Sequence, residues 1–159
     1  MIARAEWVST LHALPDEDLL TLAADLSTDW RIHPRSVPQS GLGMLKLQDS
    51  AFEEPFFLGE FPMASAWVEI VTPEGVHAEG AAQVMSDRVE VAEALALFDA
   101  VLSAHLPGWK RVAGMLDRGL AIREAICGER KQMLSRTRVD FSLLDEITPD
   151  SLEANNVGD

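Results

Sequence analysis

The sequence predicts an α+β fold, in which an antiparallel meander sheet of four to five strands is flanked by N-terminal helices and two long C-terminal helices. Apolar residues recur at helical spacing near both ends of the chain, whereas between them the apolar period falls to two residues. A turn sequence with proline and glycine joins two of the alternating runs, as in a hairpin. With 159 residues, the chain can bury one good core and is too short for two comfortable domains.

The start of the chain predicts two short helices separated by Pro15. Proline is favoured in the first turn of a helix, so the second helix is expected to begin there. The apolar positions at helical spacing are Trp7, Val8, Leu11 and Leu14 in the first helix and Leu19, Leu20, Ala23 and Leu26 in the second.

Alternating runs predict the strands, at residues 30–37, 42–47, 55–61, 63–72 and 76–85. The last two are joined by Thr72-Pro73-Glu74-Gly75, in which proline fixes one backbone angle and glycine tolerates a positive one. Small side chains on one face of this hairpin suit close packing of a helix; they belong to Ala64, Ala66, Val68 and Ile70 on one strand and to Val76, Ala78, Gly80, Ala82 and Val84 on the other.

The helical period returns after residue 86 and predicts two long helices. Asp87 is expected to cap the first, with Glu90 three places later, and Pro107-Gly108 ends it. The second is expected over about residues 109–137, with Gly119 and Gly128 as weak points. The apolar stripe of the first helix consists of Val91, Leu95, Phe98, Leu102 and Leu106.

One domain is expected over residues 1–144, followed by a tail over residues 145–159. The tail is acidic and polar and has no apolar period, so it is expected to fray. No internal repeat interrupts the domain, and no run approaches the roughly 20 apolar residues that cross a bilayer. Membrane insertion is therefore not expected.

Composition excludes several classes of function. A formal net charge of -13 repels nucleic acids and anionic membranes unless positive charge is concentrated locally. The single cysteine, Cys127, cannot form an internal disulfide, and the first twenty residues lack the pattern of a signal peptide. We therefore expect a cytoplasmic protein that binds no nucleic acid.

Motifs for catalysis or cofactors are not recognisable. The four histidines, His12, His33, His77 and His105, show no metal-ligand spacing, so no metal is expected and each is read first as a solvated or structurally paired side chain. Cys127 lies in a helical pattern and lacks an identifiable base, which favours a structural side chain over a nucleophile. No phosphate-binding loop is present, so we expect no cofactor, and the catalytic residues, if any, are unknown.

Positive charge gathers in the last helical region. Residues 108–138 contain eight basic and three acidic residues, a balance of +5, which leaves -18 for the rest. On a continuous helix, Arg123 and Arg130 fall near the middle of the apolar stripe and need an anion there. They could bond the protein's own carboxylates, or the helix could break at a glycine. Alternatively, they face a subunit interface or a phosphate.

Glu60 is a second candidate, because it alternates onto the strand face of Phe56 and Leu58, where a carboxylate needs a donor. It could pair with one of those arginines, or it could lie in water on an edge strand.

The third candidate is the segment Arg138-Val139-Asp140-Phe141. Arg138, Asp140 and Phe141 could anchor the end of the last helix or contact a partner.

Several ordered segments resemble the PhnG family, small subunits of the bacterial carbon-phosphorus lyase system. They are Arg4-Ala5-Glu6-Trp7-Val8 with Leu11, Phe57-Leu58-Gly59-Glu60 before an apolar strand, Ala92-Glu93 followed by Asp99-Ala100, and Arg138-Val139-Asp140-Phe141. The resemblance spans roughly residues 3–142. Each motif is short, so the resemblance depends on the occurrence of all of them in this order.

The resemblance implies a heteromeric core complex that, with an ATP-binding partner, exchanges the adenine of a nucleoside triphosphate for a phosphonate. Other subunits then break the carbon-phosphorus bond. The small subunit is implied to support its partners rather than perform the chemistry, and its fold combines helices with an antiparallel sheet. The implied partners are the other carbon-phosphorus lyase subunits and a second copy, as a homodimer.

The sequence departs from the family pattern at several positions. Ser65 and Ala66 stand where the family typically carries arginine and cysteine, Val91 replaces a histidine, and residues 142–146 differ after the last motif. Two hypotheses follow: a subunit that keeps its supporting role, or a paralogue outside the complex. The paralogue would bind a small anion such as phosphate, phosphonate or a nucleotide, or act as a homo-oligomeric scaffold.

Overall fold

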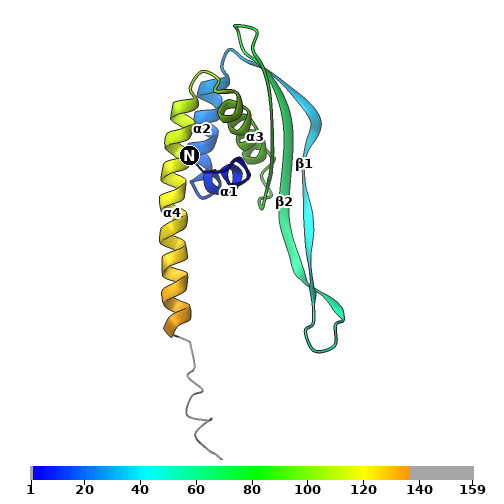
Figure 1. Ribbon diagram of the computed structural model, residues 1–159. Coiled ribbons are helices and arrows are strands. Elements are labelled where there is room, and N and C mark those ends of the chain that lie inside the picture. The colour runs from blue at the N-terminus through cyan, green and yellow to red at the C-terminus, as the bar shows by residue number, and fades with distance from the viewer. Residues whose placement is uncertain (1, 137–159) are drawn as a thin grey trace, which may run out of the picture. The chain divides into compact units, whose positions relative to one another are not determined.

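A computed structural model describes residues 2–136 and confirms the α+β class (Figure 1). A sheet with strand order β1-β2-β3 is the β part of the described chain. In chain order the elements are the 3-10 helix η1 (Arg4–Glu6), α1 (Trp7–Leu11), α2 (Asp16–Ser27), β1 (Arg31–Gln48), β2 (Pro55–Val71), β3 (His77–Val84), α3 (Val89–Ala104) and α4 (Trp109–Arg136).

The sheet of the described chain has three strands rather than the four to five expected, because the first four runs join into two long strands. Residues 30–37 and 42–47 merge into β1, and residues 55–61 and 63–72 merge into β2. The break expected around Gln39 is absorbed by register shifts between Pro34 and Ser36 and between Ser36 and Gln39. Bulges of this kind let a strand carry extra residues and prolines without ending.

The turn between β2 and β3 forms as expected. Gly75 adopts a φ of 80° and its N–H donates to the Thr72 carbonyl at 2.9 Å. The N–H of Thr72 donates to the Val76 carbonyl at 3.0 Å, which closes the hairpin. The proline and glycine of the sequence thus set the register in which Ala64 pairs with Val84.

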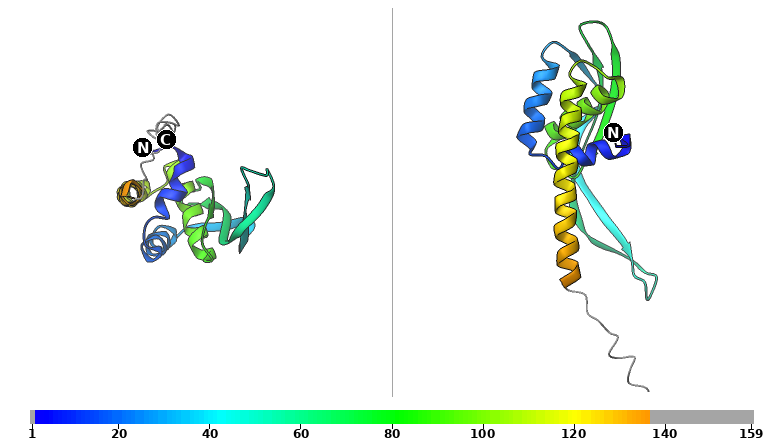
Figure 2. Two further views of the ribbon diagram at one scale, coloured as in Figure 1. Left: turned by 90° about the horizontal axis from the view of Figure 1, so that it is seen from below. Right: turned by 60° about the vertical axis from the view of Figure 1, so that its left-hand side comes forward.

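The small residues of this hairpin face the helices, as predicted, except Val76, which precedes β3 and is 45% exposed. Helices α1, α2 and α3 lie on one face of the sheet (Figure 2), where Ala64, Ala66 and Ile70 are buried. Helix α3 approaches so closely that a Cβ at Gly80 would collide with the backbone of Ala96 and Ala100. The small side chains therefore set the distance between the helix and the sheet.

Helix α3 is buried along almost its whole length, and its predicted stripe lies in the core. The expected cap is wrong: the N-cap residue is Arg88, and the hydroxyl of Ser86 accepts its N–H at 3.1 Å. The helix ends at Ala104, three residues before Pro107, and its C-cap residue His105 adopts a φ of 50°.

An ion pair with a buried carboxylate joins the N-terminal part of the chain to α3 and the sheet. Arg4 donates to both carboxylate oxygens of Asp99, at 2.9 and 2.7 Å, and Asp99 also accepts the N–H of Ala81 at 3.2 Å. The hydrogen bond to Asp99 raises the pKa of Arg4 above its ordinary value. Asp99 is only 6% exposed, so three donors satisfy a carboxylate inside the core.

Residues 1–124 form one compact unit, and the chain from Ala125 forms a second. Helix α4 is continuous past Gly119 and Gly128, so the helix break considered for these positions does not occur. Its buried residues, Val112, Met115, Leu116 and Gly119, all belong to the first unit. The expected tail, residues 145–159, lies outside the described residues.

Candidate functional site

Beyond the end of β3, the hairpin of β1 and β2 continues as a two-stranded ribbon. We call residues 41–63 the hairpin arm. The last pair between β2 and β3 is Ala64 with Val84, whereas β1 and β2 stay paired out to Gln48 and Pro55. Within the described chain, the arm strands therefore pair only with each other. A ribbon of this kind is marginally stable alone in water, because it lacks a covering layer.

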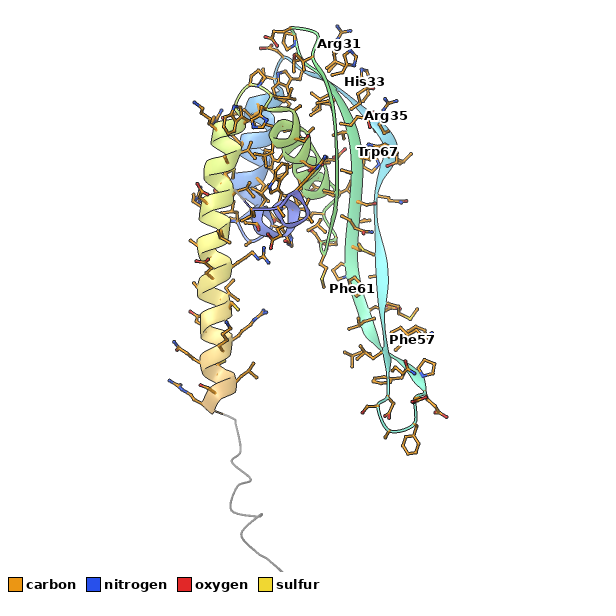
Figure 3. The ribbon with its side chains drawn as sticks, in the orientation of Figure 1. Arg31, His33, Arg35, Phe57, Phe61 and Trp67 are labelled. Carbon is orange, nitrogen blue, oxygen red and sulfur yellow. The ribbon has the colours of Figure 1, made fainter. Side chains whose placement is uncertain are left out.

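Large apolar side chains on the arm are exposed, with 39% to 79% of each accessible to solvent. Large apolar side chains that gather on one exposed element are typical of an interaction surface. Phe57 marks the outer part of the arm and Phe61 the inner part (Figure 3). The exposed residues are Leu42, Met44, Leu45, Leu47, Phe52, Phe56, Phe57 and Leu58.

Both faces of the arm carry apolar side chains. Opposite residues of an antiparallel pair share a face, and Leu42 lies opposite Pro62. On the other face Phe61 and Met63 lie over Gly43, where an added Cβ would come within 2.6 Å of the Phe61 ring and 3.2 Å of the Met63 methyl group. A sheet with one solvated face alternates apolar and polar residues, so the arm departs from the usual pattern.

A bulge and a polar loop shape the arm. Leu45 pairs with Gly59 and Lys46 pairs with Phe57, so Leu58 has no opposite residue in β1. At the tip, the Asp49 carboxylate accepts the N–H groups of Phe52 and Ala51. The bond from Phe52 and then that from Ala51 lower the pKa of Asp49. This turn holds Phe52 in an exposed position.

The arm has a net negative charge. It contains one basic residue, Lys46, and four acidic residues, Asp49, Glu53, Glu54 and Glu60. Apolar area next to carboxylates complements a surface that is apolar and basic. Two copies of the arm would repel each other.

Glu60 lies on the arm, exposed and opposite Met44. Within residues 2–124 it makes no ion pair, so the structure does not join it to Arg123. Its pairing with Arg130, which belongs to the second unit, stays a prediction. Its carboxylate lies in water beside apolar neighbours.

Arg123 lies at the end of the buried stripe of α4 and bonds hydroxyl groups rather than an anion. Its guanidinium donates to Thr10 at 2.7 Å and to Ser9 at 3.3 Å. Thr10 is fully buried, and α4 approaches it closely because Gly119 has no side chain. The arginine therefore helps to close α1 against α4 within the first unit.

Arg130 belongs to the second unit and is exposed. The expected apolar stripe continues there but is not buried, since Ile126 and Met133 are 42% and 62% exposed. Arg138, Asp140 and Phe141 lie outside the described residues, so their roles stay predictions.

A charged cluster on the sheet face away from the helices was not anticipated from the sequence. Arg35 donates to Glu79 at 2.8 Å and lies 3.5 Å from Glu69. A hydrogen bond from His77 and the charge of Arg35 lower the pKa of Glu69. Figure 3 shows Arg35 with Trp67 on this face. Arg35 of β1 thus joins Glu69 of β2 and Glu79 of β3 across the sheet. Alternation of His33 and Arg35 on a strand was the sequence signal of this cluster.

Metal-binding and membrane-spanning features are absent from the described part of the chain. Over residues 2–136, no three histidine, cysteine or acidic residues come together in a way that could hold a metal ion. None of the helices in that range is long and apolar enough to cross a membrane. Cys127 is exposed on α4.

Fold and surface together define an α+β protein that presents an unusually apolar hairpin to its surroundings. A family model described as "Phosphonate metabolism protein PhnG" matches residues 2–145. The chain therefore belongs to the PhnG family and has a role in phosphonate metabolism, as its motifs indicated. No curated protein matches the sequence.

Proposed function

We propose that this protein is a cytoplasmic supporting subunit of a carbon-phosphorus lyase core complex. The complex transfers a phosphonate onto the ribose of a nucleoside triphosphate with loss of adenine, and this subunit contributes by binding its partners. The observation that carries the proposal is the hairpin arm, whose apolar residues lie outside the core. Burying such residues against a partner removes apolar area from water, the dominant favourable contribution to association.

The family motifs that lie within residues 2–136 fall into two groups in the structure, and their placement supports this proposal. Arg4 pairs with the buried Asp99 of α3, so their motifs are explained by the fold. Phe57 and Leu58 are 60% and 63% exposed on the arm, where they contribute nothing to the core. The fold gives no reason for them, whereas a partner would.

The departures from the family pattern also fit a supporting role. Ala66 and Val91, which stand in place of a cysteine and a histidine, are buried at 3% and 0% exposure. An apolar side chain at these positions favours packing. Ser65 lies on the opposite face of β2, so the three departures do not share a site.

Self-association, if it occurs, would use α4 rather than the arm. The charge of the arm is almost wholly acidic, whereas the exposed part of α4 carries Glu124 and Glu129 among its basic residues, so two copies of it can pair opposite charges around the exposed Ile126 and Met133. Light scattering of the isolated protein measures this directly, and a dimer that Met133→Glu converts to a monomer supports it.

The anion-binding alternative has no comparable support. Of the two arginines expected to face a phosphate, Arg123 is engaged by hydroxyl groups of the protein, whereas Arg130 is exposed on α4. Calorimetry with phosphate, methylphosphonate and ATP tests this alternative, and saturable heat from the isolated chain would favour it.

The deciding experiment is a tagged purification from phosphate-starved source cells, with mass spectrometry of stoichiometric co-eluting proteins. Unmodified protein is expected to recover larger phosphonate-pathway subunits. The double variant Phe57→Ser and Leu58→Ser is expected to lose them by more than tenfold while its thermal unfolding stays within a few degrees of the parent's.

A matched control is the double variant Val37→Ser and Val76→Ser, which alters residues that are 81% and 45% exposed outside the arm. It is expected to keep the partners. Retention of the partners by the arm variant would refute the arm as the docking surface. Recovery of no partner by the unmodified protein would refute the subunit role.

A further inference from the structure

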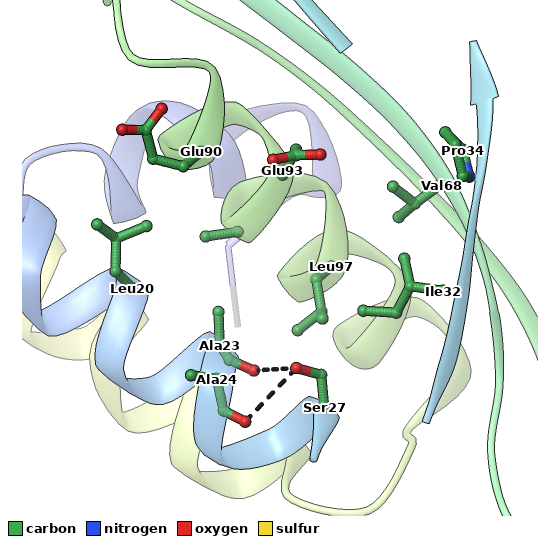
Figure 4. A pocket seen from close by; sticks show the side chains of 11 residues that line it. Leu20, Ala23, Ala24, Ser27, Ile32, Pro34, Val68, Glu90, Glu93 and Leu97 are labelled. Carbon is green, nitrogen blue, oxygen red and sulfur yellow. Dashed lines mark hydrogen bonds between the residues drawn. The ribbon is translucent and has the colours of Figure 1, made fainter. Parts of the chain in front are cut away.

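A cleft of about 370 Å³ opens between α2, α3 and the sheet, apart from the hairpin arm (Figure 4). Its floor is formed by Val68, Ala94 and Leu97, which are buried. Leu20 of α2 and Ile32 of β1 stand on opposite sides. Clefts of this volume with an apolar floor are typical of sites that take one compact group.

Two carboxylates stand at the rim of this cleft. Glu90 and Glu93 are three residues apart on α3, on the helix face that also presents Ala94 and Leu97 to the cleft. The residues that line the cleft include no lysine, arginine or histidine. The lining is thus apolar below and negative above.

The negative charge at this rim is not balanced by the protein. Glu93 makes no hydrogen bond or ion pair with any residue of the described chain. Arg88 lies 3.6 Å from Glu90, but it also lies 3.0 Å from Asp16 and 3.7 Å from Glu17. One guanidinium therefore serves three carboxylates, and the rim keeps an excess of negative charge.

A second, more polar cleft shows the opposite situation. It is lined by Asp18, Asp25, Arg111 and Arg118. Arg111 lies 3.0 Å from Asp25 and Arg118 lies 2.8 Å from Asp18, so each carboxylate there has its own cation. Unbalanced charge thus distinguishes the cleft of Glu90 and Glu93.

We propose that this cleft receives an arginine or lysine side chain presented by a partner protein. The aliphatic stem would lie against Leu20, Ile32 and Leu97, and the charged head group would lie between Glu90 and Glu93. Such side chains combine an apolar stem with a cationic end, which is the chemistry that the cleft complements.

A polypeptide is the better source of this cation than a free amino acid. Free arginine is a zwitterion at its α-carbon, and both of these charges must stay hydrated beside an apolar cleft, whereas a residue within a chain has an uncharged backbone. This inference rests on the proposed subunit role, because a partner must present the side chain, but the chemistry of the cleft can be measured without the partner.

The first test is a titration of the isotope-labelled full-length protein with N-acetyl-arginine methylamide, followed by amide NMR shifts. Saturable shifts are expected on α2 and α3, with a dissociation constant on the order of 1 mM for so small a ligand. The matched neutral probe, N-acetyl-citrulline methylamide, is expected to bind at least tenfold more weakly, because charge-assisted hydrogen bonds are lost. Equal affinity for the two probes would overturn the proposal.

Variants locate the site. Glu90→Gln with Glu93→Gln is expected to weaken binding of the arginine probe at least tenfold, whereas Asp18→Asn with Asp25→Asn is expected to leave it within twofold. An unchanged affinity in the first variant would overturn the proposal. Tight binding of n-butylguanidinium, tenfold or more above the arginine probe, would overturn the choice of a protein side chain and favour a free organic cation.

Co-purification then separates this inference from the subunit role. If the double variant Glu90→Gln, Glu93→Gln recovers the partners in the same amounts as the parent protein, the cleft inference fails and the subunit role stands. If the arginine probe binds but no partner is recovered, the subunit role fails and a cation site remains. Loss of partners in this variant, together with probe binding by the parent, supports both.

Discussion

The two halves of β2 differ in what they do with their side chains. From Ala64 to Val71 the strand pairs on both sides and presents small residues to α3, which are buried. From Pro55 to Met63 it pairs with β1 alone and presents much larger residues, which are exposed. If folding alone had set the sequence, the largest apolar residues would lie inside. The difference supports the proposal that the arm is buried against a partner rather than within the monomer.

The largest expected contrast comes from removing the same ring in the two regions. Phe98→Ala should lower the free energy of unfolding by about 4 kcal/mol, because it leaves a cavity in the core. Phe57→Ala should change it by less than about 0.5 kcal/mol, since its ring is already in water. Urea unfolding followed by circular dichroism measures both, and Phe98→Leu serves if the alanine variant does not fold. Equal losses would contradict the comparison.

Glycines give the next contrast. Gly80→Ala should cost about 2 kcal/mol, because the added methyl group collides with the backbone of α3. Gly59→Ala on the arm has nothing within 4 Å of its added methyl group and should be close to neutral. Chemical denaturation of the two variants checks this, and a neutral Gly80→Ala would show that α3 can move away from the sheet.

The buried carboxylate of the core offers a smaller effect. Asp99→Ala should cost about 1 to 2 kcal/mol, since the N–H of Ala81 loses its acceptor and Arg4 loses its partner. Much of Arg4 is exposed and regains water, which limits the loss. The surface control Asp25→Ala, which removes an exposed ion pair with Arg111, should cost less than about 0.5 kcal/mol. Thermal unfolding measures both variants. A larger loss of stability in Asp25→Ala than in Asp99→Ala would contradict the structural role of Asp99.

The smallest expected effect concerns the tip of the arm. Because the N–H groups of Phe52 and Ala51 lower the pKa of Asp49 from 3.8, its ionised form favours the turn. The stabilisation is present above that value and is lost as pH falls through the lowered pKa. NMR shifts of the Ala51 and Phe52 amides should titrate with a midpoint below 3.8. In Asp49→Asn they should stay flat, and a midpoint above 3.8 would contradict the hydrogen bonds at the tip.

Much of the fold could be predicted because local signals determine it. The helical stripe of Val91, Leu95 and Phe98 is buried as predicted, and the turn before Gly75 forms as predicted. Strand number could not be predicted, since bulges allowed β1 to pass through residues that look like a turn. The roles of Arg138, Asp140 and Phe141 remain predictions.

The candidate site was less predictable than the fold. Glu60 was selected for its place in an apolar alternation, and its neighbours on the arm are indeed apolar, but the pattern cannot tell a covered strand from a bare one. Arg123 was expected to need an anion and instead donates to Ser9 and Thr10, which precede it by more than a hundred residues. The cleft with Glu90 and Glu93 was not anticipated, because its walls come from separate elements.

By itself, the sequence determined the α+β class, the faces of the helices and of the β2–β3 hairpin, and the resemblance to the PhnG family. Those features follow from spacing along the chain, which fixes which side chains share a face. Only the tertiary structure decided that Arg4 meets Asp99, that Phe57 and Leu58 remain exposed, and that one cleft keeps unbalanced carboxylates. Those features depend on where β3 ends relative to β1 and β2 and on which elements pack together. Contacts between residues far apart in the chain produce no periodic pattern in the sequence.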